Sequence, residues 1–268
     1  AIQRSMNIRV APETVKLALG FSNQAWQYLF PKAKKPRELE DFQGIQGDQH
    51  TAPATKADLF LHVRASQAAT SYLVVDQIMG FLRPIVDVVD ETHGFHYHEG
   101  RAIIDFIDGT ENPVGEEAKK WAIIGEEDPD FINGSYAFAQ KYAHDLDAWR
   151  ALPTEVQEKY IGRRKYSDIE LEDEEKDPRA HNIISQDNRD DEEHKIVRMN
   201  VVFANPGEGI RGTYFIGYAR HWDVTRQMLT NMFTKNDRLL EYSTAEKGQL
   251  FFIPSKEILE KIAEGELF

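Results

Sequence analysis

Residues 195–219 read KIVRMNVVFANPGEGIRGTYFIGYA, and this stretch contains two apolar runs that predict β-strands at residues 195–203 and 213–219. A further strand is expected upstream, at Ser135–His144. The other elements expected in this half are helices at residues 145–152, 154–160 and 225–233, a strand at 249–253 and a helix from Ser255. Together they follow the order β-α-β-β-α-β, which is the ferredoxin-like arrangement.

The first part of the chain looks like a partial copy of the same unit. Val15–Phe21 and residues 57–65 alternate apolar and polar side chains, as half-buried strands do. A helix is predicted at residues 66–81 and a strand at residues 85–91. A full copy would need another strand and helix ahead of Ala1.

The predicted runs are too short and too interrupted for a doubly wound parallel sheet. Antiparallel sheets covered by helices fit better, so the expected class is α+β, with two ferredoxin-like domains. We place the first domain at residues 1–114, lacking its first strand and helix, and the second at residues 115–268.

The composition excludes several kinds of partner and chemistry. The chain has 268 residues and a net charge of −13, which disfavours nucleic acid and anionic membranes, and no apolar run approaches a membrane span. It has no cysteine, which excludes disulfides, iron–sulfur clusters and thiol nucleophiles. The opening residues 1–15 lack a signal-peptide pattern. A cytoplasmic location is therefore expected.

The sharpest local motif is DFIDGTENP at residues 105–113. Asp108 and Gly109 are typical of a turn, because glycine accepts positive φ and aspartate bonds its own backbone. The same turn can aim a carboxylate into a pocket, so the turn and the functional interpretation are compatible.

Histidines offer two further candidate sites. His93, His96 and His98 lie within six positions, and neutral imidazole is a common metal ligand, but a polar loop is the simpler interpretation. His181, in DPRAHNIIS, is by itself an ordinary loop histidine. Arg198 is unusual because a cation inside an apolar strand needs a partner or a cavity.

Taken together, these segments resemble the dye-decolourising peroxidase family in its compact bacterial subgroup. Residues 105–113 are similar to the family's G-x-x-D-G motif followed by T-E-N-P, which puts Asp108 on the distal aspartate. Asp105 departs from the pattern, because it stands where the family usually has the first glycine. The resemblance extends over residues 133–152, 161–171 and 212–243, and thus covers nearly the whole chain.

The resemblance also assigns the remaining site residues. His181 falls on the haem-ligating histidine, 73 positions after Asp108, and Arg198 falls on the distal arginine, 17 positions further on. Asn200 matches an asparagine beside that arginine, and Phe215 would form a distal wall. Glu241 lies where some members place an acidic hydrogen-bond partner of the haem ligand.

The resemblance implies one haem b per chain, bound between the sheet and the helices of the second domain. It implies that hydrogen peroxide oxidises dyes, phenolics or other bulky reductants through a ferryl intermediate. Asp108 would move the peroxide proton and Arg198 would stabilise the developing charge. A homo-oligomer, dimeric or hexameric, is expected, and an encapsulating protein shell is possible.

Three alternatives stay open from the sequence. The same fold could release iron from haem or oxidise porphyrinogens. A haem carrier is a second possibility, although it would need the ligand alone and not Asp108 with Arg198. The third is a non-haem metalloprotein built on His93, His96 and His98.

Overall fold

A computed structural model describes residues 2, 5 and 15–266 of the chain. Residues 1–15, whose sequence lacks a signal-peptide pattern, lie almost wholly outside the described residues. In the part of the chain described, no helix is long and apolar enough to cross a membrane.

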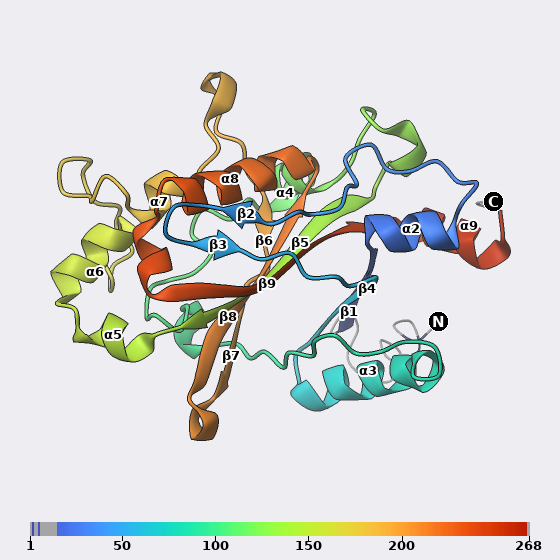
Figure 1. Cartoon of the computed structure of the whole chain (residues 1–268), viewed down its shortest axis with the longest axis horizontal. Coiled ribbons are helices and arrows are strands. Elements are labelled where there is room, and N and C mark those ends of the chain that lie inside the picture. The colour runs from blue at the N-terminus through green and yellow to red at the C-terminus, as the bar shows by residue number, and fades with distance from the viewer. Residues whose placement is uncertain (1, 3–4, 6–14, 267–268) are drawn as a thin grey trace.

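One seven-stranded antiparallel sheet organises the described residues (Figure 1). Its strands are β1 (Val15–Phe21), β4 (Leu59–Ala65), β5 (Ser135–His144), β6 (Val197–Arg198), β7 (Val201–Asn205), β8 (Ile210–Ala219) and β9 (Ser243–Ile253). The order is β4-β1-β9-β5-β8-β6, and β7 also pairs with β8. Strands β1 and β9 share a single pair, Phe21 with Phe252, which joins the β4–β1 ribbon to the rest of the sheet. The α+β class with antiparallel sheets is confirmed.

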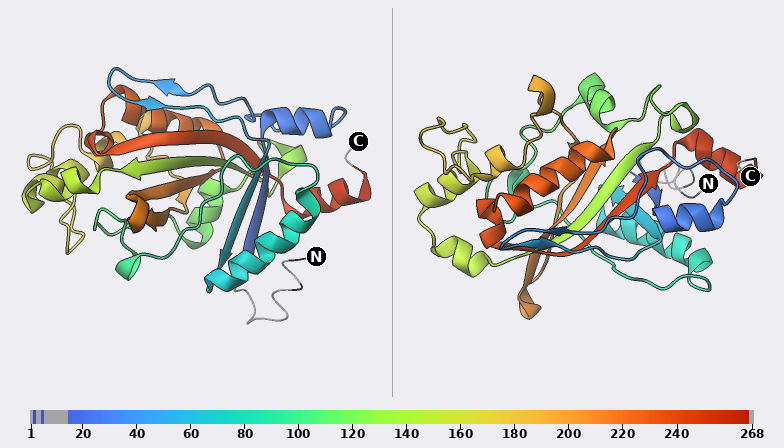
Figure 2. Two further views of the ribbon diagram at one scale, coloured as in Figure 1. Left: turned by 60° about the horizontal axis from the view of Figure 1, so that its bottom comes forward. Right: turned by 45° about the horizontal axis from the view of Figure 1, so that its top comes forward.

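The helices lie on different sides of this sheet. They are α2 (Asn23–Leu29), α3 (Ala68–Leu82), α4 (Gly115–Ala122), α5 (Leu146–Ala151), α6 (Thr154–Ile161), α7 (His181–Ile184), α8 (Trp222–Thr234) and α9 (Lys256–Glu264). Helix α8 runs along the sheet beside the short hairpin β2 (Ile45–Gln46) and β3 (Thr51–Ala52), whereas α3 lies against the β1–β4 ribbon, well away from α8 (Figure 2). Short 3-10 turns occur at His98–Gly100, Pro129–Phe131, Arg189–Asp191, Pro206–Glu208 and Arg238–Glu241.

An aromatic core fixes α8 on its face of the sheet. Phe138 of β5 stacks on Trp222 of α8 with ring centroids 5.2 Å apart, and Trp26 of α2 meets Phe252 of β9 edge-on at 5.3 Å. All four side chains are buried, and Phe233 at the end of α8 joins the same cluster. Buried aromatic side chains contribute much of a core's stability, so this face determines where α8 and the segments attached to it lie.

Two predicted strands differ from the structure. Residues 85–91 form no strand. Ile85, Val88 and Val89 are exposed, so the apolar run does not fill a place in the sheet. Residues 195–203 form β6 and β7, with Met199 and Asn200 between them.

Strands β6 and β7 pair with β8 in one continuous register. Arg198 pairs with Gly217 and Val201 with Tyr214, so Asn200 falls opposite Phe215. The short helices α2, α4 and α7 were not predicted.

Candidate active site

The loop that carries Asp108 is shaped by two residues with left-handed backbone. Asp105 has φ +71° and Gly109 has φ +87°. Glycine adopts this region without cost, whereas aspartate is one of the few other residues that enter it readily. Asp105 therefore preserves the turn, although glycine is usual at this position. Phe106, between them, is buried against Trp149 and anchors the loop.

The side chain of Asn112 clamps this loop to β6. Its amide nitrogen donates to the backbone oxygen of Arg198 at 3.0 Å, and its oxygen accepts from the backbone N–H of Arg198 at 2.8 Å. The side chain thus replaces a missing strand neighbour at this point. Asn200 then donates to both carboxylate oxygens of Asp108, at 3.1 and 3.3 Å. The structure brings Asp108 and Asn200 into contact, and Arg198 lies two residues before Asn200 on the same face of the sheet.

Several polar atoms of this cluster are left without partners. The amide oxygen of Asn200 is buried and has no hydrogen bond. The guanidinium of Arg198 makes no hydrogen bond or ion pair within the described residues. Buried polar groups are almost always satisfied in folded proteins, so unpartnered ones indicate a place for a ligand or water.

Phe215 lies on the same face as these groups. Cross-strand partners point to one side of a sheet, and the register places Asn200 opposite Phe215 and Arg198 opposite Gly217. Phe215 packs against the core that includes Trp222 and Leu229 of α8. The cluster therefore faces the side of the sheet on which α8 lies.

His181 is the first residue of α7, which packs against α8. Its Nδ1 is 2.8 Å from a carboxylate oxygen of Asp237, which directly follows α8 in a turn. Asp237 is fully buried, and its other oxygen accepts the backbone N–H of Leu239 at 2.8 Å. The second ring nitrogen, Nε2, has no hydrogen-bond partner in the described part of the chain. This is the arrangement that orients a metal-binding imidazole.

The prediction that Glu241 is the hydrogen-bond partner of His181 is wrong. Glu241 is exposed and accepts from Arg238 at 2.7 Å and from Arg179 at 3.3 Å. These arginines hold its carboxylate away from His181, and Asp237 takes the position beside the imidazole. The sequence signal that could have identified Asp237 is its place immediately after a helix, where an acid caps the following turn.

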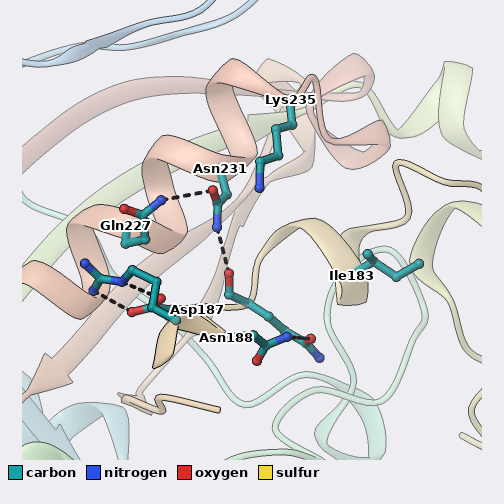
Figure 3. Close-up of a pocket in the computed structure, with 8 residues that line it drawn as sticks. Ile183, Asp187, Asn188, Gln227, Asn231 and Lys235 are labelled. Atoms are coloured by element: carbon teal, nitrogen blue, oxygen red, sulfur yellow. Dashed lines mark hydrogen bonds and ion pairs between the residues drawn. The ribbon is translucent and has the colours of Figure 1, made fainter. Parts of the chain in front are cut away.

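The segment after His181 is tied to α8 by side-chain hydrogen bonds (Figure 3). Asn231 donates to the backbone oxygen of Gln186 at 2.8 Å and accepts from Gln227 at 3.1 Å. The buried carboxylate of Asp187 receives two bonds of 2.7 Å from Arg189. These residues line a polar cavity of about 270 Å³ beside α7, and the contacts hold α7 in position.

His93, His96 and His98 do not form a site. All three side chains are exposed, and His93 pairs with Glu91 at 2.8 Å. Among the residues that the structure describes, no three His, Cys, Asp or Glu side chains converge to bind a metal. The non-haem alternative is therefore not supported.

The chain thus combines an aspartate loop clamped to the sheet with a histidine bound to a buried carboxylate, and its sequence matches the models of a known family. Residues 4–96 match the model of the amino-terminal domain of Dyp-type peroxidases, and residues 99–258 match that of the carboxyl-terminal domain. The chain belongs to the Dyp-type peroxidase family.

Its relatives carry the name dye-decolorizing peroxidase. The protein from Rhodococcus erythropolis is 40% identical over 265 residues, which cover 97% of this chain and 77% of that protein. The protein from Brevibacterium linens is 43% identical over 274 residues, covering 99% of this chain and 74% of the relative.

Solved structures of other Dyp-type peroxidases superpose closely on this chain. The dye-decolorizing peroxidase of Bacteroides thetaiotaomicron superposes with a TM-score of 0.93 at 48% identity, covering 97% of this chain and 85% of that one. DypB of Rhodococcus jostii gives 0.93 at 40% identity, covering 96% and 84%, and variants of it at an arginine, an aspartate and an asparagine are described in complex with heme. An encapsulated relative from Mycobacterium smegmatis gives 0.93 at 39% identity, covering 97% and 85%.

Proposed function

We propose that the chain is a haem peroxidase that binds one haem b through His181 and uses hydrogen peroxide to oxidise dyes, phenolics or other organic reductants. The observation that carries the proposal is that two groups of polar residues on the α8 side of the sheet keep atoms without hydrogen-bond partners. His181 is fixed by Asp237 with Nε2 unpartnered, and Arg198 and Asn200 keep unpartnered polar atoms beside Asp108.

These residues fit a haem. A single neutral imidazole is an ordinary axial ligand, and the guanidinium of Arg198 suits a propionate or a peroxide oxygen. Phe215 offers an apolar wall on the same face. When bound, the haem would supply the iron that accepts the two oxidising equivalents of peroxide. A haem carrier would need only His181, so the assembled Asp108–Asn200 pair favours the peroxidase.

Each residue has a defined task in this proposal. His181 would hold the haem iron through Nε2, while its Nδ1–H donates to Asp237, which fixes the tautomer and the ring orientation. The Asp108 carboxylate would take the proton from one peroxide oxygen and return it to the other, which leaves as water when the bound haem supplies the two electrons that break the O–O bond. Asn200 orients that carboxylate, and Arg198 stabilises the negative charge on the leaving oxygen.

The variants of the Rhodococcus jostii relative support this choice of residues. They alter an aspartate, an arginine and an asparagine, and the arginine precedes the asparagine by two positions. Arg198 precedes Asn200 by the same spacing.

The test is spectroscopic. Wild type and the variants His181→Ala, Asp108→Ala and Arg198→Ala are loaded with haem, and the Soret band is followed before and after peroxide. We expect His181→Ala to lose the axial-ligand spectrum, and the other two to bind haem normally but to react with peroxide at least 100-fold more slowly. His96→Ala and Asp173→Ala, both at exposed positions, are the matched controls. An unchanged His181→Ala spectrum would refute the iron ligand, and wild-type rates in both distal variants would refute the mechanism.

Five narrower points belong to the same proposal. We infer that residues 1–114 and 115–268 are two ferredoxin-like domains, in accord with the separate matches of the two family models. We infer a homo-oligomer and a cytoplasmic location from the sequence, and a small-molecule reductant from the peroxidase chemistry. A protein shell is a further possible partner, because the Mycobacterium smegmatis relative is encapsulated.

A further inference from the structure

A second cavity, of about 350 Å³, lies on the face of the sheet away from α8. It is bounded by β1, β4, α4 and the β6–β8 strands. Met199, which stands between Arg198 and Asn200, lines it together with Tyr218 and Ile253. These three pack with Phe60 and Phe251 in a core that is separate from the one beneath α8. The cavity and the Asp108 cluster therefore lie on opposite faces of the same strands.

The lining combines an apolar wall with a polar end. Val197, Met199 and Ile253 supply the apolar surface. At the polar end, the Nδ1 atom of His62 lies 2.8 Å from the hydroxyl of Tyr218. Pockets of this size with a few convergent polar groups are typical of sites for small organic molecules.

The charge at the mouth of the cavity is positive. Lys16 and Arg64 line it, both are exposed, and neither makes an ion pair with an acid of the described chain. The guanidinium of Arg64 donates a hydrogen bond to the sulfur of Met199, at 3.1 Å. Burial, with the charge of Arg64, lowers the pKa of His62 to about 4, so His62 is neutral at pH 7. Among the described residues no carboxylate lines the cavity, and the positive charge there comes from Lys16, Arg64 and Lys119, of which Lys119 pairs with Glu116.

We propose that this cavity binds an aromatic anion, such as a phenol that carries a carboxylate or sulfonate, and that it is the site of the organic reductant. The aromatic ring packs on Val197, Met199 and Ile253, and the anionic group pairs with Lys16 and Arg64. This step rests on the proposed peroxidase function, because it names the substrate class for it.

The strand register explains why such a site is useful to a peroxidase. Tyr218 pairs with Val197, and its neighbour Gly217 pairs with Arg198. A donor in the cavity is therefore one sheet thickness from the distal residues. Each peroxide is reduced to two waters and takes one electron and one proton from each of two phenolic donors, which leave as phenoxyl radicals.

Binding is tested by isothermal titration of the haem-loaded protein with naphthalene-2-sulfonate, which is not oxidised. We expect Lys16→Gln with Arg64→Gln to weaken binding about tenfold, because two partly exposed ion pairs are lost. Ala118→Phe on α4, which fills the cavity without changing charge, is expected to abolish binding. Lys32→Gln with Lys56→Gln, two exposed lysines outside the cavity, removes the same charge and should bind as wild type.

Kinetics give a second readout. With a hydroxynaphthalene sulfonate as reductant, the charge variant should raise KM about tenfold and leave kcat and the peroxide reaction unchanged. Unaltered binding in both the charge variant and Ala118→Phe would overturn the proposal, as would equal weakening in the lysine control. Thermal unfolding shows whether Ala118→Phe is folded, and the charge variant decides the question if it is not. A protein that binds the sulfonate through these residues but does not react with peroxide would refute the proposed function and leave the binding site standing.

Discussion

Asn112 is the side chain on which the geometry of the distal loop depends. Its amide makes two hydrogen bonds to the backbone of Arg198, at 2.8 and 3.0 Å, and these hold the Asp108 loop on β6. Asn112→Ala removes both bonds, whereas Asn112→Asp keeps an acceptor for the Arg198 N–H and loses only the donor. The two variants therefore form a graded series at one position.

The magnitude follows from the number of bonds lost. An intramolecular hydrogen bond contributes about 1 kcal/mol to the free energy of unfolding, so Asn112→Ala should lose about 2 kcal/mol. Asn112→Asp should lose at least about 1 kcal/mol, because its second carboxylate oxygen faces the carbonyl oxygen of Arg198. In a protein of this size the larger loss lowers Tm by about 5 °C. Arg198 stays in place through its pairing with β8, so the loop and Asp108 move and the strand does not.

Urea denaturation gives the stability, and stopped-flow spectroscopy of the haem-loaded protein gives the peroxide rate. We expect Asn112→Ala to bind haem normally and to react with peroxide about tenfold more slowly, because Asp108 is less well positioned. Asn188→Ala, which removes only an exposed bond to Gln186, should change stability by less than about 0.5 kcal/mol. If Asn112→Ala matches that control in stability and wild type in peroxide rate, the loop is held by something other than Asn112.

Three further predictions concern the histidine partner, a surface ion pair and the distal turn. Asp237→Asn should keep the axial ligand but raise the reduction potential of the haem by about 60 mV, because a charge-assisted hydrogen bond is replaced by a neutral one that is weaker by about 1.4 kcal/mol. Glu241→Gln should leave the potential unchanged in the same spectroelectrochemical titration. Burial alone would raise the pKa of Glu127, but the hydrogen bonds and charge of Arg220 lower it to about 2. The stabilisation is therefore present above the ordinary value of 4.5 and is lost as pH falls toward 2, so Glu127→Gln should destabilise the protein in urea at pH 7 and no longer do so near pH 2. Asp105→Val should cost about 1–2 kcal/mol in urea denaturation because φ is +71° there, and Asp105→Gly should lie within about 0.5 kcal/mol of wild type.

The strands that the sequence predicts correctly are those whose side chains alternate or are buried over several residues. Val15–Phe21 and Ser135–His144 match β1 and β5 at both ends. Residues 85–91 are also partly apolar. A strand needs a neighbouring strand to pair with, however, and an apolar composition does not show whether one is present. Asp90 in this segment instead accepts hydrogen bonds from Lys141 and Lys247. Helix α7 has only four residues, which is too few to show a helical period.

The turn that carries Asp108 was more accessible to sequence reasoning than the histidine partner, and the reason is distance along the chain. Asp105, Asp108, Gly109 and Asn112 belong to one short turn, where local chemistry restricts the backbone. His181 meets its partner only after the chain has crossed 56 residues and the length of α8.

Local competition decides which acid reaches the histidine. Glu241 stands three residues after Arg238 in a 3-10 turn, which places the two side chains side by side, and Arg179 approaches the same carboxylate. Asp237 begins that turn and is fully buried, with one oxygen on the Leu239 N–H and the other free to face His181. An acid with an arginine at this spacing is therefore a poor candidate for a distant histidine. An acid at the first position of a turn, with one oxygen already fixed by the backbone, is a good one.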